Sequence, residues 1–193
     1  MADEHLTEHS LGGVVLTAGN FLTVRRDDVR LPDGKTATRE FVVHPGAVVV
    51  VPLQDDGRLL LIRQFRYPIG RVLLEFPAGK IDAGEDTLVC GRRELLEETG
   101  ASGGEWAHAG TLHNACAYST EHIEIWFARG LLAGPQKLDD GEFIELVSMS
   151  ETELDAAAGR GEITDAKTLI GLLWLQRWRA GAWPLAWRGV DNG

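Results

Sequence analysis

One segment of this chain, residues 79–101, constrains the fold more than any other, because it has the pattern of a loop followed by a helix with well-marked ends. Acidic residues Glu85 and Asp86 come before the helix, where negative charge favours the positive end of the helix dipole. Gly100 follows the helix, since glycine readily takes the left-handed conformation that ends one. The pattern therefore predicts a helix over residues 87–99.

Three glutamates, Glu94, Glu97 and Glu98, lie near the end of this predicted helix. Positions three or four residues apart share one helix face, so these carboxylates repel one another unless a cation lies among them. Oxygen ligands of this kind suit Mg²⁺, with Mn²⁺ as a substitute, and Mg²⁺ tends to share its shell with substrate phosphates. A cluster of this size on its own is more often a solvated acidic surface, so the residues around it must decide.

The spacing of the surrounding residues favours the metal site. Gly79 is followed after five residues by Glu85, after seven more by Arg93-Glu94-Leu95, and then by Glu97-Glu98 and Gly100. This pattern resembles the Nudix box, GX5EX7REUXEEXGU, in which U is a bulky aliphatic residue. Every fixed glycine, glutamate and arginine of the box is present, and only Ala101 is smaller than the usual aliphatic residue.

The resemblance implies a loop–helix–loop that binds a divalent metal and a diphosphate. The implied metal ligands are Glu94 and Glu98, with Glu97 joining directly or through water, Glu85 in support, and the backbone carbonyl of Ala78 completing the shell. The resemblance also implies that Arg93 holds the glutamates in place by ion pairing.

Segments outside the box extend the resemblance over roughly residues 36–180, to the ADP-ribose pyrophosphatase group of the Nudix family. These segments are RQFRYP at 63–68, LEFPAG at 74–79, YSTEHIEIWFARG at 118–130 and GEFIELV at 141–147. By this comparison Glu142 lies in a loop that carries a catalytic glutamate, with Asp140 as the obvious substitute. The implied substrate-binding residues are Arg66, Glu75 and Arg63, with Arg39 and Glu40 from a partner subunit.

The implied reaction is Mg²⁺-dependent attack of water on one phosphorus of a nucleoside diphosphate derivative, with ADP-ribose giving AMP and ribose 5-phosphate. One stretch departs from the group: residues 114–119 (NACAYS) lack the proline and glycine of its PxxGxS/T-like motif. Another nucleotide sugar, such as GDP-mannose, therefore stays open as the substrate. A binding module that does not cut the nucleotide is the alternative from another class, although such modules often lose a box carboxylate and none is lost here.

Composition bounds the partners and the compartment. The net charge of −10 over 193 residues argues against a nucleic-acid surface, because phosphate backbones attract basic patches. The start, MADEHLTEHS, lacks the pattern of a signal peptide, and the longest apolar stretch, 46–53, is far shorter than a membrane span. The two cysteines fit a reducing compartment, and Cys116 is expected to be a buried thiol. These features predict a cytoplasmic protein without a membrane partner.

The remaining pattern predicts an α/β fold, in which a mixed sheet lies between helices as an α/β/α sandwich of the Nudix type. Expected strands lie within residues 11–26 and at 36–43, 46–52, 59–64, 72–76, 110–113, 123–129 and 143–149, and further helices at 151–159 and 165–179. The all-apolar run GAVVVVP at 46–52 is typical of a strand buried on both faces. We expect an N-terminal β segment over residues 1–43 and a hydrolase domain over 44–193. The resemblance implies that the N-terminal segment forms the interface of a homodimer.

Overall fold

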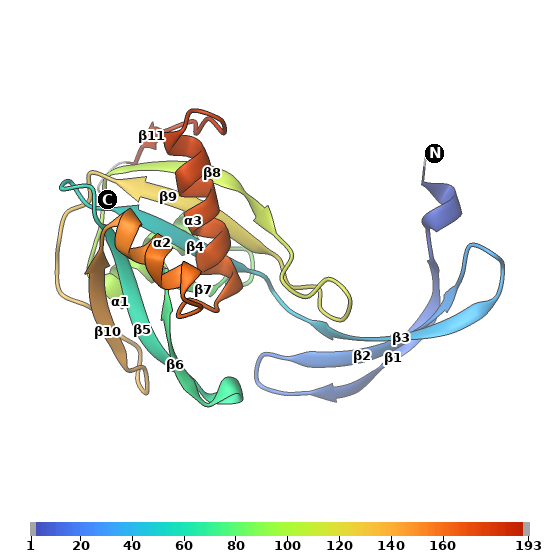
Figure 1. Cartoon of the computed structure of the whole chain (residues 1–193). Helices are drawn as coiled ribbons and strands as arrows, with labels where there is room; N and C mark the ends of the chain where they lie inside the picture. The colour runs from blue at the N-terminus through green and yellow to red at the C-terminus, as the bar shows by residue number, and fades with distance from the viewer. Residues whose placement is uncertain (1–2, 191–193) are drawn as a thin grey trace. The chain divides into compact units, whose positions relative to one another are not determined.

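The structure is a computed structural model that describes residues 3–190 (Figure 1). It divides them into two compact units. One unit contains the chain up to Gly46 together with His113–His122, and the other contains Ala47–Leu112 and the chain from Ile123 onward. Each unit is described by itself.

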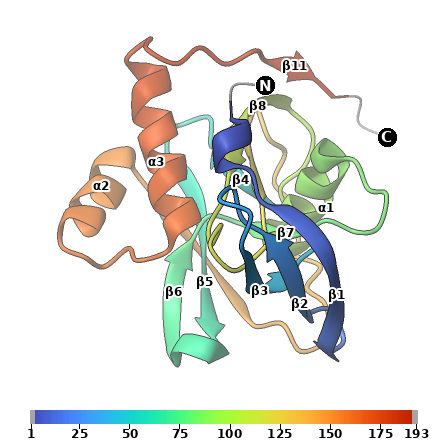
Figure 2. The same cartoon turned by 90° about the vertical axis from the view of Figure 1, so that its right-hand side faces the viewer.

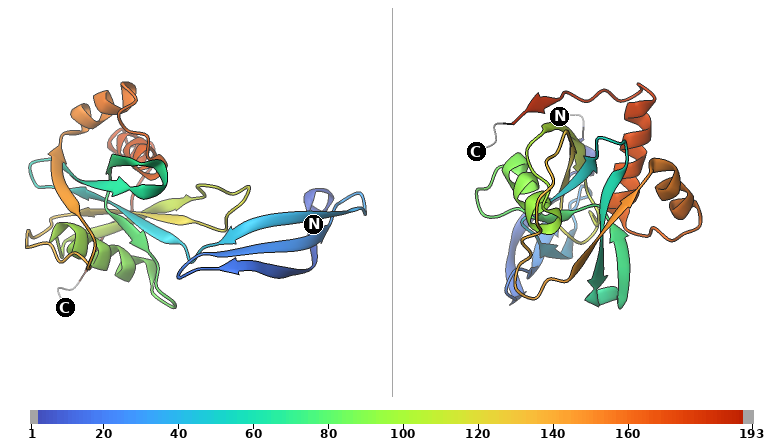
Figure 3. Two further views of the ribbon diagram at one scale, coloured as in Figure 1. Left: turned by 90° about the horizontal axis from the view of Figure 1, so that it is seen from below. Right: turned by 90° about the vertical axis from the view of Figure 1, so that its left-hand side faces the viewer.

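The first unit is an antiparallel sheet in the order β1-β2-β3, seen as a twisted ribbon in Figure 3. Its elements are a 3-10 turn η1 (Glu4–Leu6) and the strands β1 (His9–Ala18), β2 (Thr23–Arg30) and β3 (Thr36–Val43). Residues 31–35 make the turn that LPDGK predicts, with Gly34 at φ +84°. The segment His113–His122 joins this unit, since Val42 N–H donates to Tyr118 O at 2.9 Å and Thr120 N–H donates to Val42 O at 2.9 Å.

The second unit is built on a mixed sheet in the order β10-β5-β4-β9-β8-β11, with β6 paired to β5 and β7 to β4. Its strands are β4 (Ala47–Leu53), β5 (Leu59–Arg66), β6 (Arg71–Glu75), β7 (Ala78–Lys80), β8 (Glu105–Leu112), β9 (Ile123–Arg129), β10 (Ile144–Met149) and β11 (Arg188–Gly189). The β4–β9 pair is parallel and the other pairs are antiparallel. A 3-10 turn η2 (Tyr67–Ile69) joins β5 to β6.

Helices cover both faces of this sheet. They are α1 (Thr87–Thr99), α2 (Glu151–Gly159) and α3 (Ala166–Arg179). Figure 2 shows α1 on one side of the sheet and α2 with α3 on the other. Strand β4 is buried on both faces from Val48 onward: Val49 and Val51 pack in the core with α2 and α3, and Val48 and Val50 pack in the core with α1. The expected α/β/α sandwich is confirmed.

Three elements differ from the sequence prediction. Strand β7 lies inside the expected loop 77–85, because its three residues form a strand only by pairing with β4. Strand β8 begins at Glu105 instead of residue 110. The sequence prediction starts too late because Trp106 and Ala107 are both buried, which breaks the alternation of buried and exposed residues expected of a strand. The C-terminal segment, for which no strand is predicted, adds β11 to the sheet edge beside β8.

The tryptophans of α3 pack against that C-terminal segment. The ring of Trp174 lies 4.4 Å from that of Trp183, and the ring of Trp178 lies 5.4 Å from that of Trp187. Both rings therefore pack against the segment that follows the helix. No helix within residues 3–190 is long and apolar enough to cross a membrane.

Candidate active site

Local sequence accounts for the position and ends of α1. The Asp86 carboxylate caps the helix by accepting from Leu88 N–H at 2.9 Å and Val89 N–H at 3.3 Å. Gly100 ends the helix at φ +75°, where a Cβ would lie 2.1 Å from the carbonyl oxygen of Gly134. Only glycine fits both the conformation and the close approach of this loop.

Arg93 connects the glutamates of the preceding loop and the helix. Its guanidinium binds both carboxylate oxygens of Glu85, at 2.9 and 3.0 Å. It also donates to Glu94 at 2.7 Å and to Glu97 at 3.1 Å. The hydrogen bonds from Arg93 lower the pKa of Glu85 to about 2. Arg93 thus brings together three of the side chains that the box pattern singles out.

Glu98 is the most buried carboxylate of the box, with 3% of its surface exposed. Its Oε2 accepts from Ala78 N–H at 3.0 Å. Burial raises its pKa to about 8, with the charges of Glu94 and Glu142 acting in the same direction and the Ala78 N–H and Arg66 acting against them. Burial likewise raises the pKa of Glu94, against the opposing effect of Arg93. A buried carboxylate in this environment is stabilised by a bound cation or by a proton.

The loop after β9 reaches the end of α1 and brings Glu142 near the helix carboxylates. Lys137 N–H donates to the carbonyl oxygen of Glu97 at 2.8 Å, and the Gln136 side chain donates to the carbonyl oxygen of Glu98 at 2.6 Å. Glu142 is half-buried, and its charge contributes to the raised pKa of both Glu94 and Glu98. Asp140 is exposed.

Arg66 and Glu75 form a paired group on β5 and β6. The guanidinium of Arg66 binds the fully buried Glu75 carboxylate through two hydrogen bonds of 2.7 Å. Burial tends to raise the pKa of Glu75, but Arg66 and Lys167 outweigh it and the net shift is downward. Arg66 also interacts with the charge of Glu98, which connects this pair to the box carboxylates.

Sequence reasoning missed two residues of this group, Lys167 and Asp165. Lys167 Nζ donates to Glu75 and, at 2.9 Å, to Asp165, the N-cap residue of α3. The available signal was a lysine in the first turn of a helix, where the dipole disfavours positive charge unless carboxylates compensate it.

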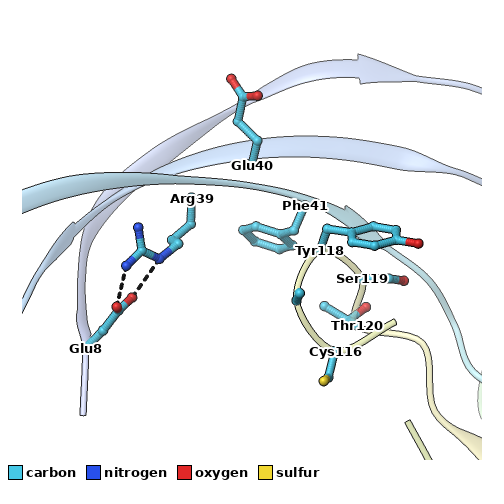
Figure 4. A pocket seen from close by; sticks show the side chains of 9 residues that line it. Glu8, Arg39, Glu40, Phe41, Cys116, Tyr118, Ser119 and Thr120 are labelled. Atoms are coloured by element: carbon cyan, nitrogen blue, oxygen red, sulfur yellow. Dashed lines mark hydrogen bonds and ion pairs between the residues drawn. The ribbon is translucent and has the colours of Figure 1, made fainter. Parts of the chain in front are cut away.

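Two other predicted substrate-binding residues, Arg63 and Arg39, form ion pairs with other acids. Arg63 is on β5 and pairs with Glu145 of β10 at 2.7 Å, with both side chains largely exposed. Arg39 is on β3 of the first unit and pairs with Glu8. Figure 4 shows Arg39 and Phe41 on one side of β3 and Glu40 on the other.

The first unit holds a cavity of about 340 Å³ beside β3. Glu8, the β3 residues Arg39–Phe41, and Cys116–Thr120 line it. Residues 116–119 of the stretch that departs from the group's motif thus line the same cavity as Arg39. Cys116 is exposed, so the expectation of a buried thiol was wrong: its segment pairs with β3 at the edge of the first unit instead of entering the core.

The donor set around α1 fits Mg²⁺ or Mn²⁺, because it consists of carboxylate oxygens near a backbone turn and includes a buried acid. Within residues 3–190 no three His, Cys, Asp or Glu side chains already stand in the geometry of a metal shell. Instead, carboxylate oxygens of Glu85, Glu94 and Glu97 accept hydrogen bonds from Arg93. The carboxylates here that could hold such an ion are Glu98, Glu94 and Glu97.

Comparisons with known proteins match this architecture. The NUDIX domain model covers residues 43–169, and the nucleoside diphosphate sugar hydrolase N-terminal domain model covers residues 15–42. The chain is 32% identical to the ADP-ribose pyrophosphatase of Bacillus subtilis, over 89% of this chain and 94% of that one. It is 34% identical to the methanol dehydrogenase activator of Bacillus methanolicus, over 82% and 87%.

A solved structure, titled as the crystal structure of an ADP compounds hydrolase, shares the fold. It superimposes with a TM-score of 0.81 at 24% identity, covering 91% of this chain and 96% of that one. The resemblance inferred from the box spacing is confirmed by the domain model and by full-length relatives. This chain belongs to the Nudix hydrolase family.

Proposed function

We propose that this enzyme hydrolyses the diphosphate bond of a nucleoside diphosphate derivative in a Mg²⁺-dependent reaction, with ADP-ribose as the preferred substrate and AMP and ribose 5-phosphate as products. The observation that carries the proposal is the buried Glu98, held against the Ala78 backbone beside Glu94 and near Arg66. Such a group of charges suits a cation and a diphosphate together. The B. subtilis relative, named an ADP-ribose pyrophosphatase, supports the substrate.

Different side chains of this protein bind the metal, bind the substrate and accept the proton in this reaction. Glu98, Glu94 and Glu97 would hold Mg²⁺, which when bound would offset phosphate charge and lower the pKa of water. Arg66 donates to phosphoryl or ribose oxygens, and Glu75 fixes its guanidinium. Glu142 accepts a proton from the attacking water, the new oxygen–phosphorus bond forms, and the bridging phosphorus–oxygen bond breaks.

Glu142 and Asp140 can be separated by matched amide substitutions. Glu142→Gln removes the base whose charge reaches Glu94 and Glu98. We expect kcat to fall roughly 10²- to 10⁴-fold. Asp140→Asn alters an exposed carboxylate and is expected to change kcat by less than about twofold. Steady-state kinetics on both variants checks this, and a larger loss in Asp140→Asn would reverse the assignment.

Gly79→Ala tests whether the position of the Glu94 carboxylate matters. A Cβ at Gly79 would lie 1.9 Å from that carboxyl carbon, so Glu94 must move aside. Because Glu94 is the end of a flexible side chain, we expect little change in Tm but a large loss of kcat and a weaker Mg²⁺ response. The matched control is Gly159→Ala, where nothing lies within 4 Å of the added carbon. Normal turnover in Gly79→Ala would contradict the role of Glu94.

The experiment that tests the function is a Mg²⁺-dependent hydrolysis screen of nucleoside diphosphate derivatives with product analysis. We expect AMP from ADP-ribose at the highest kcat/KM. GDP-mannose as the best substrate would instead assign a different nucleotide sugar. Tight ADP-ribose binding with no AMP released over hours would indicate a binding module.

A homodimer completes the proposal, with residues 1–43 as the dimerisation segment and the cytoplasm as its compartment. Strand β1 is exposed along its whole length and presents Leu11, Val14, Val15 and Leu16, each about half exposed. Exposed apolar side chains on an edge strand favour cover by another chain. We expect light scattering to give twice the mass of the 21.1 kDa chain. A monomer mass would refute the dimer without affecting the hydrolase assignment.

A further inference from the structure

The first turn of α3 is hydrogen-bonded to the end of β6, where Glu75 holds Arg66. Asp165 caps the helix, and its Oδ2 accepts from Thr168 N–H at 2.9 Å and from the Thr168 hydroxyl at 2.6 Å. The Thr168 Oγ1 accepts in turn from Phe76 N–H at 2.9 Å, and both of these residues are fully buried. The start of α3 is therefore fixed against the residue that follows Glu75.

Lys167, in the same turn of α3, connects two carboxylates through one ammonium group. Its Nζ donates to Glu75 Oε2 and, at 2.9 Å, to Asp165 Oδ1. The side chain of Lys167 is only 12% exposed, and that of Glu75 is 1% exposed. The N-terminus of a helix disfavours a positive charge, so a lysine at this position depends on the two acids. Its ammonium is a largely buried charge beside the pair that is proposed to bind substrate.

The guanidinium of Arg66 uses only some of its donors on Glu75. Nε and Nη2 each donate to one carboxylate oxygen at 2.7 Å. Nη1 makes no hydrogen bond with residues 3–190, and 36% of the side chain is exposed. The N–H groups of Nη1 are therefore available to an oxygen of a bound diphosphate.

Asp165 is a competing acceptor for this free donor. Arg66 lies close enough to Asp165 for their charges to interact. With Lys167 present, the cations Arg66 and Lys167 balance the anions Glu75 and Asp165. Without the lysine, one guanidinium would face two carboxylates. A partly buried carboxylate that has lost its cation takes the nearest available donor, because an unpaired charge is costly there.

We propose that Lys167 is a positioning residue for diphosphate binding, an inference that rests on the proposed hydrolysis. Its ammonium neutralises Asp165 and holds Glu75, so that Nε and Nη2 of Arg66 stay on Glu75 and Nη1 stays free for a phosphate oxygen. Lys167 acts through Arg66 and does not itself touch the substrate. Loss of the ammonium turns Nη1 toward Asp165 and leaves a net negative charge beside the diphosphate.

Lys167→Met tests this, because it keeps the aliphatic stem and removes the ammonium. We expect the Kd of α,β-methylene-ADP, an analogue that cannot be hydrolysed at its bridge, to rise roughly ten- to thirtyfold in the presence of Mg²⁺. KM for ADP-ribose should rise in step, while kcat stays within about threefold because the box carboxylates and Glu142 are unchanged. Calorimetric titration measures Kd, and steady-state kinetics measures KM and kcat.

The matched control is Lys35→Met in the turn between β2 and β3. Lys35 is exposed and pairs with Asp33 at 2.7 Å. Removing this charge should change neither the Kd of the analogue nor KM, since a surface ion pair contributes little.

A second substitution separates positioning from a structural role. Asp165→Asn removes the competing charge and still caps α3, because asparagine is as good an N-cap residue as aspartate. In the double variant of Lys167→Met with Asp165→Asn, Arg66 again faces one carboxylate. Kd and KM should then return to within about threefold of the wild type. A lysine that only packed against the helix would not be rescued in this way, and neither would one that bound phosphate directly.

Three results would overturn the inference. They are an unchanged Kd and KM in Lys167→Met, a fall in kcat with normal KM, and weak binding that persists in the double variant. Thermal unfolding checks the fold of each variant. If Lys167→Met does not fold, Lys167→Gln takes its place, since its amide still donates to a carboxylate but has no charge.

The titration needs no turnover, so failure of the hydrolase proposal can be told from failure of this one. A wild type that binds the analogue but does not hydrolyse ADP-ribose would fail the proposed function. An active wild type with the same Kd and KM as Lys167→Met would fail only the role of Lys167.

Discussion

Glu98→Gln is expected to abolish turnover, with kcat falling by about 10³-fold or more, while the fold stays intact. The substitution keeps the size of the side chain and its contact with Ala78 but removes the charge that would bind the cation. Mg²⁺ should raise Tm of the wild-type protein and leave that of the variant nearly unchanged. Kinetics with added Mg²⁺ and thermal unfolding with and without it measure both effects.

In the metal-free protein, the same variant is expected to be more stable than the wild type at high pH. Burial raises the pKa of Glu98 from 4.5 to about 8, so the folded state holds a proton that the unfolded state has lost. This contribution is fully present below about pH 4.5 and is lost as pH rises through about 8. Glu98→Gln has no such loss. Its free energy of unfolding should therefore exceed that of the wild type by roughly a few kcal/mol near pH 8 and match it near pH 5.

A matched control separates the buried charge from carboxylates in general. Glu105→Gln alters a half-exposed carboxylate that pairs with Arg129 on the surface. It should leave kcat, the Mg²⁺ response and the pH profile of unfolding unchanged. Wild-type turnover in Glu98→Gln would remove Glu98 from the metal site, and a stability difference independent of pH would remove its titration from the account.

Arg93→Met is expected to destabilise the fold and to abolish activity together. Without the Arg93 guanidinium, the carboxylates of Glu85, Glu94 and Glu97 would lose their common ion-pair partner and repel one another. Breaking a partly buried charge cluster of this kind costs roughly 2–4 kcal/mol. Chemical denaturation measures the stability, and turnover at saturating Mg²⁺ shows whether added cation compensates for the lost guanidinium.

Two further variants serve as controls for Arg93→Met. Arg160→Met removes an exposed arginine that pairs with its near neighbour Glu162 on the surface, and it should have almost no effect. Arg93→Lys keeps one charge but cannot reach the three carboxylates with a planar fork, so it should behave like Arg93→Met in activity. Full activity in Arg93→Lys would mean that charge alone, and not the geometry of the guanidinium, arranges the glutamates.

The sequence by itself determined the elements whose signals are local. Helix α1 begins and ends where the Asp86 cap and Gly100 predict, and the run of valines in β4 is buried on both faces as expected. Spacing along one helix also placed Glu94, Glu97 and Glu98 on a common face, and the family was inferred once the box residues around them were added. These features depend on neighbours within a few residues, so periodicity and capping express them fully.

Only the tertiary structure decided which distant residues meet. The strand β7, the pairing of Lys167 with Glu75 and the exposure of Cys116 all depend on chain segments brought together by folding. A single sequence contains no register between strands and no record of which buried charges pair. The loop–helix box therefore predicted the chemistry, whereas sheet pairing and burial decided which side chains surround it.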